Sequence, residues 1–392
     1  MDKIKELLTR GVEEVIVSEN LKKELKSGKK IRVKFGIDPT APYLHLGHTV
    51  PLRKLRAFQD LGHQAVLIIG DFTATIGDPT GRNELRKQIT SSEVKKNMKT
   101  YLEQANKILD MKKLEIHYNS EWFDDAGILT MYELMSKISV QRAMERDDFK
   151  KRMALDMEVS VLELMYPILQ GYDSVMVKAD LEIGGTDQKF NLLMGRRVQR
   201  AYKMKEQNIL TTRIIEGTDG VRKMSKSYDN YIALTEKPEL MYGKIMSIPD
   251  DLIVKYFRAL TDVPINEVEA MLKLSQTKSK KWDPRKAKGR LAYEIVKTYY
   301  NAKEALLAEN KFIKIFAKGE VPDDILEYKL KNKETFVDVL INSKLVTSKS
   351  EARRAIEQGG VSIDGEKITD INLVAKPGVL KKGKRHFIKI TN

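Results

Sequence analysis

Two short segments of the sequence carry side chains suited to binding phosphate. The first is His45-Leu46-Gly47-His48, and the second is the run Lys223-Met224-Ser225-Lys226-Ser227. Imidazole N–H groups and ammonium groups donate hydrogen bonds to phosphate oxygens, and a glycine lets a phosphate or a flat ring approach the backbone. A polar turn or a pair of metal ligands is the alternative for the histidines. A solvated basic loop is the alternative for the lysines.

The elements around the histidine segment are expected to form one strand–helix–strand unit. Residues 31–37 first alternate between apolar and polar side chains and then become apolar. Residues 47–61 have helical apolar spacing, and residues 65–69 form a continuous apolar run. Such a run is typical of a buried parallel strand. The histidines therefore lie where a strand passes into a helix, and the backbone N–H groups there favour anions.

The rest of the chain is assigned from its periodicity and from its glycine and proline residues. Expected helices cover residues 3–28, most of residues 93–165 and residues 233–328. Expected strands cover residues 175–177, the neighbourhood of Ile183, and residues 208–215. From residue 335 onward the elements are expected to be short, and they are separated by glycines.

Bulk composition limits the class of protein. A chain of 392 residues predicts two or three domains, and its net charge of +15 favours a polyanionic partner such as nucleic acid. The sequence has no cysteine, which excludes disulfides, thiolate catalysis and cysteine-bound zinc. Neither an apolar leader nor an apolar run of about 18 residues is present, so a soluble cytoplasmic protein is expected, with no membrane partner.

The order of the motifs resembles that of bacterial tyrosyl-tRNA synthetases, which belong to class I. The segments that carry the resemblance cover essentially the whole chain: KFGIDPTAPYLHLGH, FQDLGH, IIGDFTATIGDPTGR, YPILQGYDS, GGTDQKFN and KMSKS. The family signatures commonly called HIGH and KMSKS stand here as HLGH and as a complete KMSKS.

The resemblance implies an α/β fold in three parts. The first is a Rossmann-like parallel-sheet catalytic domain over residues 1–232, with a helical insertion at about 100–165. An α-helical anticodon-binding domain over residues 233–330 follows. The last part, residues 331–392, is a small α+β RNA-binding domain of the αL type, similar to a ribosomal protein.

A pocket for the amino acid is predicted on one helix face. Tyr166, Gln170 and Asp173 are spaced by four and three residues, which places them together if the segment is helical. With Asp78 and Gln188 they could hold a zwitterion, whereas an exposed polar face is the alternative.

The resemblance gives these residues separate roles. Tyr166, Gln170 and Asp78 match positions that bind the tyrosine amino group, Asp173 matches the acceptor of the phenol hydroxyl, and Gln188 lies near the carboxylate. Lys34 stands where the best-known branch has a tyrosine that helps to bind the phenol, which leaves that contact open.

The resemblance also assigns the ATP side of the site. Gly185 and Asp187 match contacts to the ribose, and Asp38 lies close to the adenylate. Residues expected to position and neutralise the phosphates are Thr40, His45, Gly47, His48, Lys223 and Lys226. Arg82 and Arg86 follow the GDPT turn and could reach pyrophosphate, although a solvated helix start is the alternative.

The C-terminal segment is the densest in positive charge. Residues 331–392 contain 13 Lys and Arg against 7 Asp and Glu. A solvated charged face is the alternative to an RNA-binding one. Candidate RNA contacts are Lys349, Arg353, Arg354, Lys381, Lys382, Lys384 and Arg385.

The activity that the resemblance implies is ligation of tyrosine to tRNA(Tyr) in two steps, with ATP and Mg²⁺, by a homodimer joined through the helical insertion. No structural metal is expected. Three alternatives stay open: the tryptophanyl enzyme, a non-catalytic RNA-binding relative of a synthetase, and a coenzyme adenylyltransferase. The first lacks the GYD pattern, the second conflicts with intact motifs, and chains of the third kind are usually short.

Overall fold

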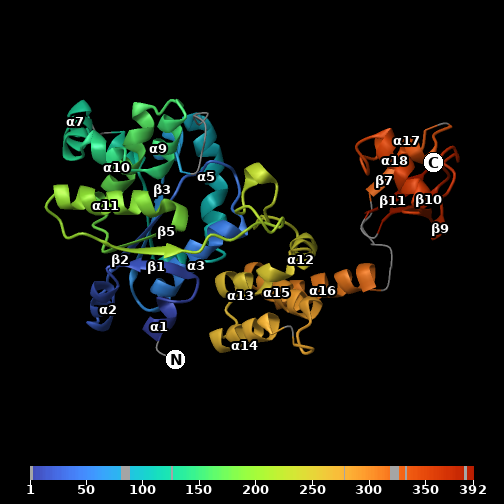
Figure 1. Cartoon of the computed structure of the whole chain (residues 1–392), viewed down its shortest axis with the longest axis horizontal. Helices are drawn as coiled ribbons and strands as arrows, with labels where there is room; N and C mark the ends of the chain where they lie inside the picture. Colours follow the sequence, from blue (N-terminus) through green and yellow to red (C-terminus); the bar gives the residue numbers. More distant parts are fainter. Residues whose placement is uncertain are drawn as a thin grey trace. The chain divides into compact units, whose positions relative to one another are not determined.

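The computed structural model describes residues 3–80, 89–124, 127–277, 279–317, 326–331, 333–383 and 386–392. The chain divides into two compact units, Met1–Ala302 and Lys303–Asn392. Figure 1 shows both units with their helices and strands. No described helix has the length and apolar character that crossing a membrane requires.

A six-stranded sheet forms the centre of the first unit, with the strand order β1-β6-β5-β2-β3-β4 (Figure 1). Neighbouring strands are parallel except β1, which runs antiparallel to β6. The expected Rossmann-like α/β architecture is confirmed. The strands are β1 (Val12–Ile16), β2 (Arg32–Ile37), β3 (Gln64–Ile69), β4 (Leu114–Tyr118), β5 (Leu181–Gly185) and β6 (Asn208–Thr212).

The strand order reverses between β2 and β5. From β2 the chain moves outward through β3 to β4, and from β5 it moves the other way to β6. Helix α3 (Leu46–Asp60) joins β2 to β3, and α11 (Lys189–Ala201) joins β5 to β6. Right-handed crossovers in opposite directions place these helices on opposite faces, and a crevice opens at the carboxyl ends of the two central strands.

Helix α10 (Val161–Met176) packs against α11 at unusually close range. A Cβ atom on Gly171 would lie 2.8 Å from Cγ2 of Val198 and 3.2 Å from Cα of Gly195. Glycine at position 171 therefore lets the two helices approach one another closely. The close contact fixes the face of α10 that points toward the crevice.

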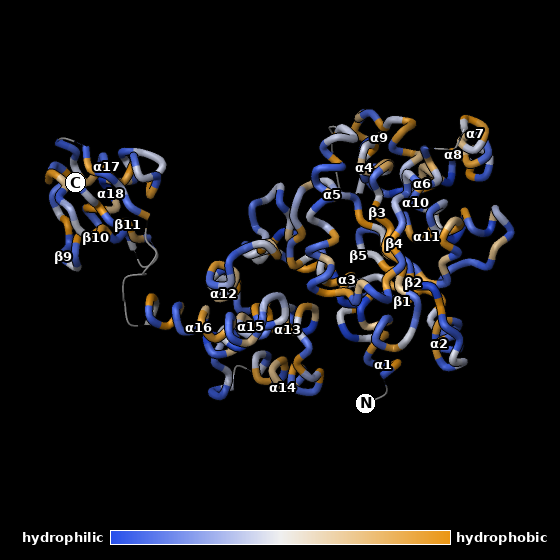
Figure 2. The backbone as a smooth tube through the Cα atoms, turned by 180° about the vertical axis from the view of Figure 1, so that it is seen from behind, coloured by the Kyte–Doolittle hydropathy of each residue, from blue (hydrophilic) through white to orange (hydrophobic). Residues whose placement is uncertain are grey.

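Further helices precede α10 in the chain, and another group of helices follows strand β6. Figure 2 shows the hydrophobic stretches concentrated along the strands of the first unit. The helices before α10 are α1 (Lys3–Leu7), α2 (Ser18–Lys26), α4 (Thr73–Ile76), α5 (Ser91–Ala105), α6 (Ser120–Phe123), α7 (Ile128–Lys137), α8 (Val140–Ala143) and α9 (Asp147–Ala154). Those after β6 are α12 (Pro238–Met246), α13 (Ile253–Leu260), α14 (Ile265–Gln276) and α15 (Pro284–Tyr299). Short 3₁₀ turns are η1 (Met111–Lys113), η2 (Thr186–Gln188), η3 (Lys226–Tyr228) and η4 (Asp250–Leu252).

The second unit has its own sheet and its own core. Strand order is β7-β11-β10-β8-β9, with β7 parallel to β11 and the other pairs antiparallel. Buried residues such as Phe336 and Ile356 pack into one cluster against this sheet. The elements are α16 (Ala302–Ala317), which starts at the boundary, β7 (Leu326–Lys329), α17 (Phe336–Asn342), α18 (Lys349–Glu357), β8 (Val361–Ile363), β9 (Glu366–Lys367), β10 (Gly378–Lys382) and β11 (His386–Thr391).

Three expectations about local structure were wrong. Residues 326–328, expected to be helical, belong to strand β7. Residues 3–28 are not one helix, because Gly11 adopts a φ of 65° and residues 12–16 pair with β6 as an edge strand. Residues 175–177 are not a strand, because α10 continues to Met176. A short apolar run does not by itself distinguish a strand from a buried helix end.

Candidate active site

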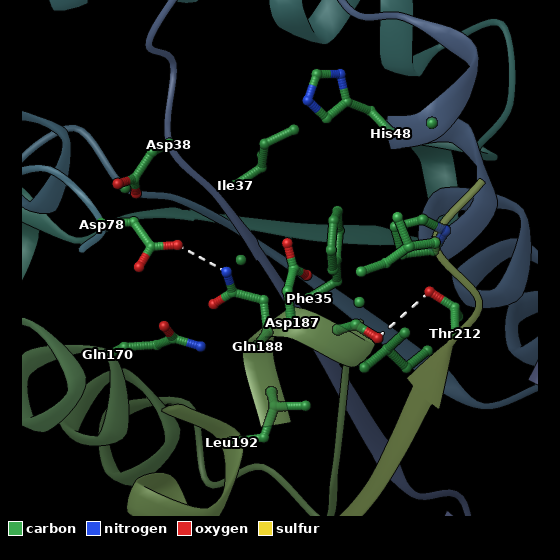
Figure 3. Close-up of a pocket in the computed structure, with 18 of the residues that line it drawn as sticks. Phe35, Ile37, Asp38, His48, Asp78, Gln170, Asp187, Gln188, Leu192 and Thr212 are labelled. Carbon is green, nitrogen blue, oxygen red and sulfur yellow. Dashed lines mark hydrogen bonds between the residues drawn. The ribbon is translucent and has the colours of Figure 1, made fainter. Parts of the chain in front are cut away.

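A cavity of about 340 Å³ lies at the carboxyl ends of the central strands. Figure 3 shows side chains from β2, from α10, from the 3₁₀ turn after β5 and from the segment after β3 around it. It sits at the point where the strand order reverses, which is where ligands bind in folds of this kind. Sequence-predicted residues that line it are Asp38, Thr40, His45, Gly47, His48, Asp78, Tyr166, Gln170, Asp173, Gly185, Asp187, Gln188 and Lys223.

The two histidines form the cap of α3. Nδ1 of His45 accepts a hydrogen bond from the Gly47 N–H at 3.2 Å, and Nδ1 of His48 accepts one from the His45 N–H at 3.2 Å. Their rings stack with centroids 3.7 Å apart. Because each Nδ1 accepts, each neutral ring carries its hydrogen on Nε2. A Cβ atom on Gly47 would lie 2.9 Å from Cε1 of His45, so the cap requires glycine there.

Both rings are uncharged at neutral pH. Burial lowers the pKa of His45 to about 3, and the nearby Lys226 and Lys223 contribute to that lowering. Burial likewise places the pKa of His48 well below its ordinary value. The imidazoles can therefore serve as neutral N–H donors, while lysines supply the positive charge.

Asp38 connects β2 to α10 and to the segment after β3. Its carboxylate accepts hydrogen bonds from Oγ1 of Thr73 at 2.9 Å and from the hydroxyl of Tyr166 at 2.9 Å. A Cβ atom on Gly70 would lie 2.1 Å from Oδ1 of Asp38, so glycine is needed for this approach. The contact orients the hydroxyl oxygen of Tyr166 at the cavity wall.

Helix α10 presents the predicted polar face to the cavity. Tyr166, Gln170 and Asp173 all line it. Nε2 of Gln170 donates to Oε1 of Glu182 at 3.2 Å, which directs the other amide atom, Oε1, toward the ligand space. Oδ1 of Asp173 accepts from Nε1 of Trp122 at 3.0 Å. Burial raises the pKa of Asp173 to about 7, and the charge of Lys34 opposes that rise.

Asp78 and Gln188 meet across the cavity. Nε2 of Gln188 donates to Oδ2 of Asp78 at 2.6 Å, the contact drawn in Figure 3. The backbone N–H of Thr80 donates to Oδ1 of Asp78 at 2.9 Å. These bonds hold the carboxylate in the turn after α4, facing the polar side of α10.

The two lysines of the KMSKS segment occupy different places. Nζ of Lys223 forms an ion pair with Oδ2 of Asp187 at 3.0 Å. Nζ of Lys226 lies 4.6 Å from the centre of the Tyr43 ring, and burial lowers its pKa to about 8. Both charges remain close enough to His45 to lower its pKa.

The candidate RNA contacts of the second unit differ in their surroundings. Arg353 and Arg354 are exposed on α18. Lys349 lies 4.0 Å from Asp338, whereas Nζ of Lys382 donates to Leu345 O and to Glu351 at 2.7 and 2.9 Å. Nζ of Lys381 lies 5.2 Å from the centre of the Phe387 ring. The predictions for Arg82, Arg86, Lys384 and Arg385 fall outside the described residues.

Sequence reasoning missed several partners of the site. Trp122 comes from α6 and Thr73 from α4, and neither was singled out as a site residue. Glu182 was also missed, although a glutamate inside a buried strand was a usable signal. Among the described residues, no three acidic or histidine side chains gather in a way that could hold a metal ion.

Comparison with known proteins identifies the family. The profile of class I tRNA synthetases for tryptophan and tyrosine matches residues 26–317, and that of the SYY-like C-terminal domain of tyrosine–tRNA ligases matches residues 318–390. The tyrosine–tRNA ligase of Thermotoga maritima is 50% identical over 98% of this chain and 96% of its own length. The chain belongs to the tyrosine–tRNA ligase family of class I.

Other tyrosine–tRNA ligases match the chain as well. The tyrosine–tRNA ligase of Dehalococcoides mccartyi is 49% identical over 99% of this chain and 98% of its own length. A C-terminally truncated mitochondrial tyrosyl-tRNA synthetase of Aspergillus nidulans superposes with a TM-score of 0.66 at 25% identity, covering 80% of this chain and 94% of that one. The tyrosine–tRNA ligase fold thus accounts for most of the chain.

Proposed function

We propose that this chain joins tyrosine to tRNA(Tyr) in two steps, first forming tyrosyl-adenylate from ATP. The observation that carries the proposal is one cavity of about 340 Å³ in which HLGH, the first lysine of KMSKS and the polar face of α10 meet. Phosphate-binding groups and an amino-acid pocket share one space, as adenylate formation requires.

Tyrosine is recognised at both of its ends. The hydroxyl oxygen of Tyr166, Oε1 of Gln170 and the Asp78 carboxylate are acceptors suited to the three hydrogens of an ammonium group. Asp173 accepts the phenol hydrogen at the buried end, and Gln188 lies near the carboxylate. Phenylalanine would leave a buried acceptor without its donor, and tyrosyl enzymes are a well-known example of rejection on this ground.

Adenylate formation needs no protein nucleophile. A tyrosine carboxylate oxygen attacks the α-phosphorus, and the bond to pyrophosphate breaks. Nε2–H groups of His45 and His48 donate to phosphate oxygens, while Lys223 and Lys226 neutralise the charge that builds up on the leaving group. Thr40 and Asp38 position the phosphates and the adenylate, Gly47 lets the nucleotide approach α3, and Gly185 with Asp187 binds the ribose.

ATP enters as its magnesium complex, in which the ion belongs to the substrate. Magnesium keeps several waters and binds through substrate phosphates rather than through an all-protein cage. Arg82 and Arg86 are proposed to contact the pyrophosphate end.

Transfer to tRNA is the second step. A hydroxyl of the terminal adenosine attacks the tyrosyl carbonyl, and AMP leaves. We assign residues 1–232 to catalysis, residues 233–330 to anticodon binding and residues 331–392 to RNA contact. The exposed Arg353 and Arg354 of α18 support the last assignment.

A homodimer is proposed through the helical insertion. Large apolar side chains are exposed along it, including Leu129 at 77%, Val140 at 71% and Leu155 at 72%. Apolar surface of this kind marks interaction sites. We expect Leu129→Asp combined with Leu155→Asp to give a monomer by light scattering. A wild-type protein that is already monomeric at micromolar concentration would contradict the dimer.

One experiment tests the activity against its alternatives. ATP–pyrophosphate exchange is measured with each of the amino acids in turn. We expect exchange with tyrosine alone. Exchange with tryptophan would indicate the tryptophanyl enzyme. Absence of exchange with every amino acid would indicate a non-catalytic RNA-binding protein or an adenylyltransferase for another substrate.

A further inference from the structure

A buried lysine lies behind the wall of the tyrosine pocket. Lys34 of β2 has a fully buried side chain, and its Nζ lies 2.8 Å from Gln170 O, 2.8 Å from Oγ of Ser174 and 2.9 Å from Oε1 of Glu182. An ammonium group has three hydrogens. Three oxygen acceptors therefore satisfy this group, and a direct bond from Lys34 to the phenol is not expected.

Lys34 and Glu182 are a cross-strand ion pair. The two residues stand opposite one another in the parallel pairing of β2 with β5, and both side chains are almost completely buried. Glu182 also accepts hydrogen bonds from Gln170, from Ser174 and from Gln207. The pair thus ties two central strands to the turn of α10 that contains residues 170–174.

That turn carries two side chains of the proposed pocket. Gln170 bonds to Glu182 through its side chain and to Lys34 through its backbone carbonyl. Asp173 lies one residue before Ser174, the other α10 partner of Lys34. A shift of this turn would move the acceptors for both the ammonium group and the phenol. Displacements of about 1 Å can cost a hundredfold in rate.

The charges of the pair also act on Asp173, and in opposite senses. Lys34 lowers the pKa of this carboxyl, and Glu182 raises it. Asp38 raises it as well, and the Trp122 N–H lowers it. Beyond the Trp122 ring lies His117, whose imidazole bonds to Glu115 and Glu121. Asp78, His45 and His48 line the same cavity as Asp173. Because the pKa values of both histidines lie below the neutral range, their rings carry no charge that would act on Asp173 at neutral pH.

We propose that Lys34 and Glu182 are positioning residues for tyrosine selectivity: their ion pair holds the 170–174 turn and keeps Asp173 ready to accept the phenol hydrogen. The inference rests on the proposed tyrosine activation. Stability by itself does not explain a buried ion pair, because apolar replacements of similar volume are often neutral or stabilising. Selectivity for tyrosine would explain why a charged pair is kept beside the pocket.

The test compares Lys34→Met, Glu182→Gln and the double variant with the wild type. The quantity measured is kcat/KM for tyrosine divided by kcat/KM for phenylalanine, in ATP–pyrophosphate exchange, from about pH 5.5 to about pH 8.5. Phenylalanine lacks the hydroxyl, so effects of Lys226 and of the histidines on chemistry cancel in this ratio. Lys54→Met is the matched control, because Lys54 is also a buried lysine but lies on α3, bonded to Leu7 O.

We expect Lys34→Met to lower the ratio at pH 7 at least tenfold and to change the KM for ATP less than twofold. The midpoint of the pH dependence of the ratio should move to higher pH in Lys34→Met and to lower pH in Glu182→Gln. The double variant should return toward the wild-type midpoint. Lys54→Met should leave both the ratio and the midpoint unchanged.

The outcomes separate this inference from the proposed function. A wild type without tyrosine-dependent exchange would refute the function itself. With an active wild type, an unchanged ratio in Lys34→Met, or midpoints that move in the same direction in both single variants, would overturn the inference. If Lys34→Met does not fold, Glu182→Gln decides: a lower midpoint supports the inference, and an unchanged or higher midpoint refutes it.

Discussion

Replacing Lys226 by methionine removes the charge that we assign to the leaving pyrophosphate while keeping most of the side-chain volume. Nζ of Lys226 lies 4.6 Å from the centre of the Tyr43 ring, and the side chain is partly buried beside the cavity. A charge in such a partly dehydrated place acts more strongly than one in water. The variant should therefore fail in the chemical step.

The expected loss of kcat is taken from the effect of removing similar charge-stabilising donors in other enzymes. Removing one preorganised donor aimed at developing charge costs about 3 kcal/mol, or roughly 10²- to 10³-fold in kcat. Folding should change much less. The cation–π contact with Tyr43 is worth about 0.5–1 kcal/mol, and loss of the partly dehydrated ammonium offsets part of it. For a unit of this size the midpoint of thermal unfolding should move by less than about 3 °C.

The assay is tyrosine-dependent ATP–pyrophosphate exchange as a function of pH. Because burial lowers the pKa of Lys226 to about 8, the ammonium form dominates below that pH and is lost above it. The wild-type kcat/KM for ATP, which reports the free enzyme, should therefore fall as the pH rises through about 8. Lys226→Met should be slow throughout and should lack this alkaline decline.

Lys273→Met, at an exposed site on α14, is the control and should behave like the wild type. Two results would refute the reasoning: a Lys226→Met kcat equal to that of the wild type, or an alkaline decline that persists in the variant. A loss of activity accompanied by a large drop in thermal stability would show that the side chain matters for folding instead.

Three further predictions concern other parts of the chain. Asp173→Asn should lower the preference for tyrosine over phenylalanine roughly ten- to a hundredfold, because it weakens a charged hydrogen bond worth about 1.5–3 kcal/mol; kcat/KM in exchange measures this. Burial lowers the pKa of Lys54, which donates to Leu7 O, to about 7. Between that value and about 10.4 the unfolded chain binds more protons, so stability should rise with pH there, and Lys54→Met should flatten the rise in urea titrations. Changing Arg353 and Arg354 together to glutamate should raise the KM for tRNA and weaken its salt dependence, because fewer phosphate contacts remain, while leaving pyrophosphate exchange at the wild-type rate; unchanged aminoacylation at physiological salt would contradict the RNA assignment.

Local patterns in the sequence predicted the elements nearest the phosphate motifs. The unit β2–α3–β3 was recognised because apolar runs, helical spacing and a glycine stop all lie within about 40 residues. The polar face of α10 was recognised because spacings of four and three place side chains together on any helix. These features depend on neighbours in the chain, so the sequence alone reveals them.

Features that depend on distant partners were missed. Strand β1 is short and partly exposed, and it is a strand because residues 12–16 pair with β6. Its own residues, rich in glutamate and valine, resemble a helix as much as a strand. Trp122 reaches Asp173 from another element, and nothing in the local sequence around it marks that contact.

The pair of Lys34 and Glu182 lies between these two cases. Each residue stands among apolar neighbours in a central strand, and a charge rarely stays buried without a partner. In a Rossmann-like sheet, the two strands on either side of the reversal in strand order are neighbours. A lysine near the start of one and a glutamate near the start of the other could thus be paired by sequence reasoning alone. The register confirms that they face one another.

The same pairing carries a prediction about related sequences. By the resemblance described above, Lys34 stands where the best-known branch has a tyrosine, and Glu182 is its partner in this chain. A lysine buried at this position without an acidic partner would lower the stability of the fold. Sequences of the family with lysine here should therefore also place an acidic residue opposite it, and those with tyrosine should not need one. An alignment in which the two positions vary independently would contradict this coupling.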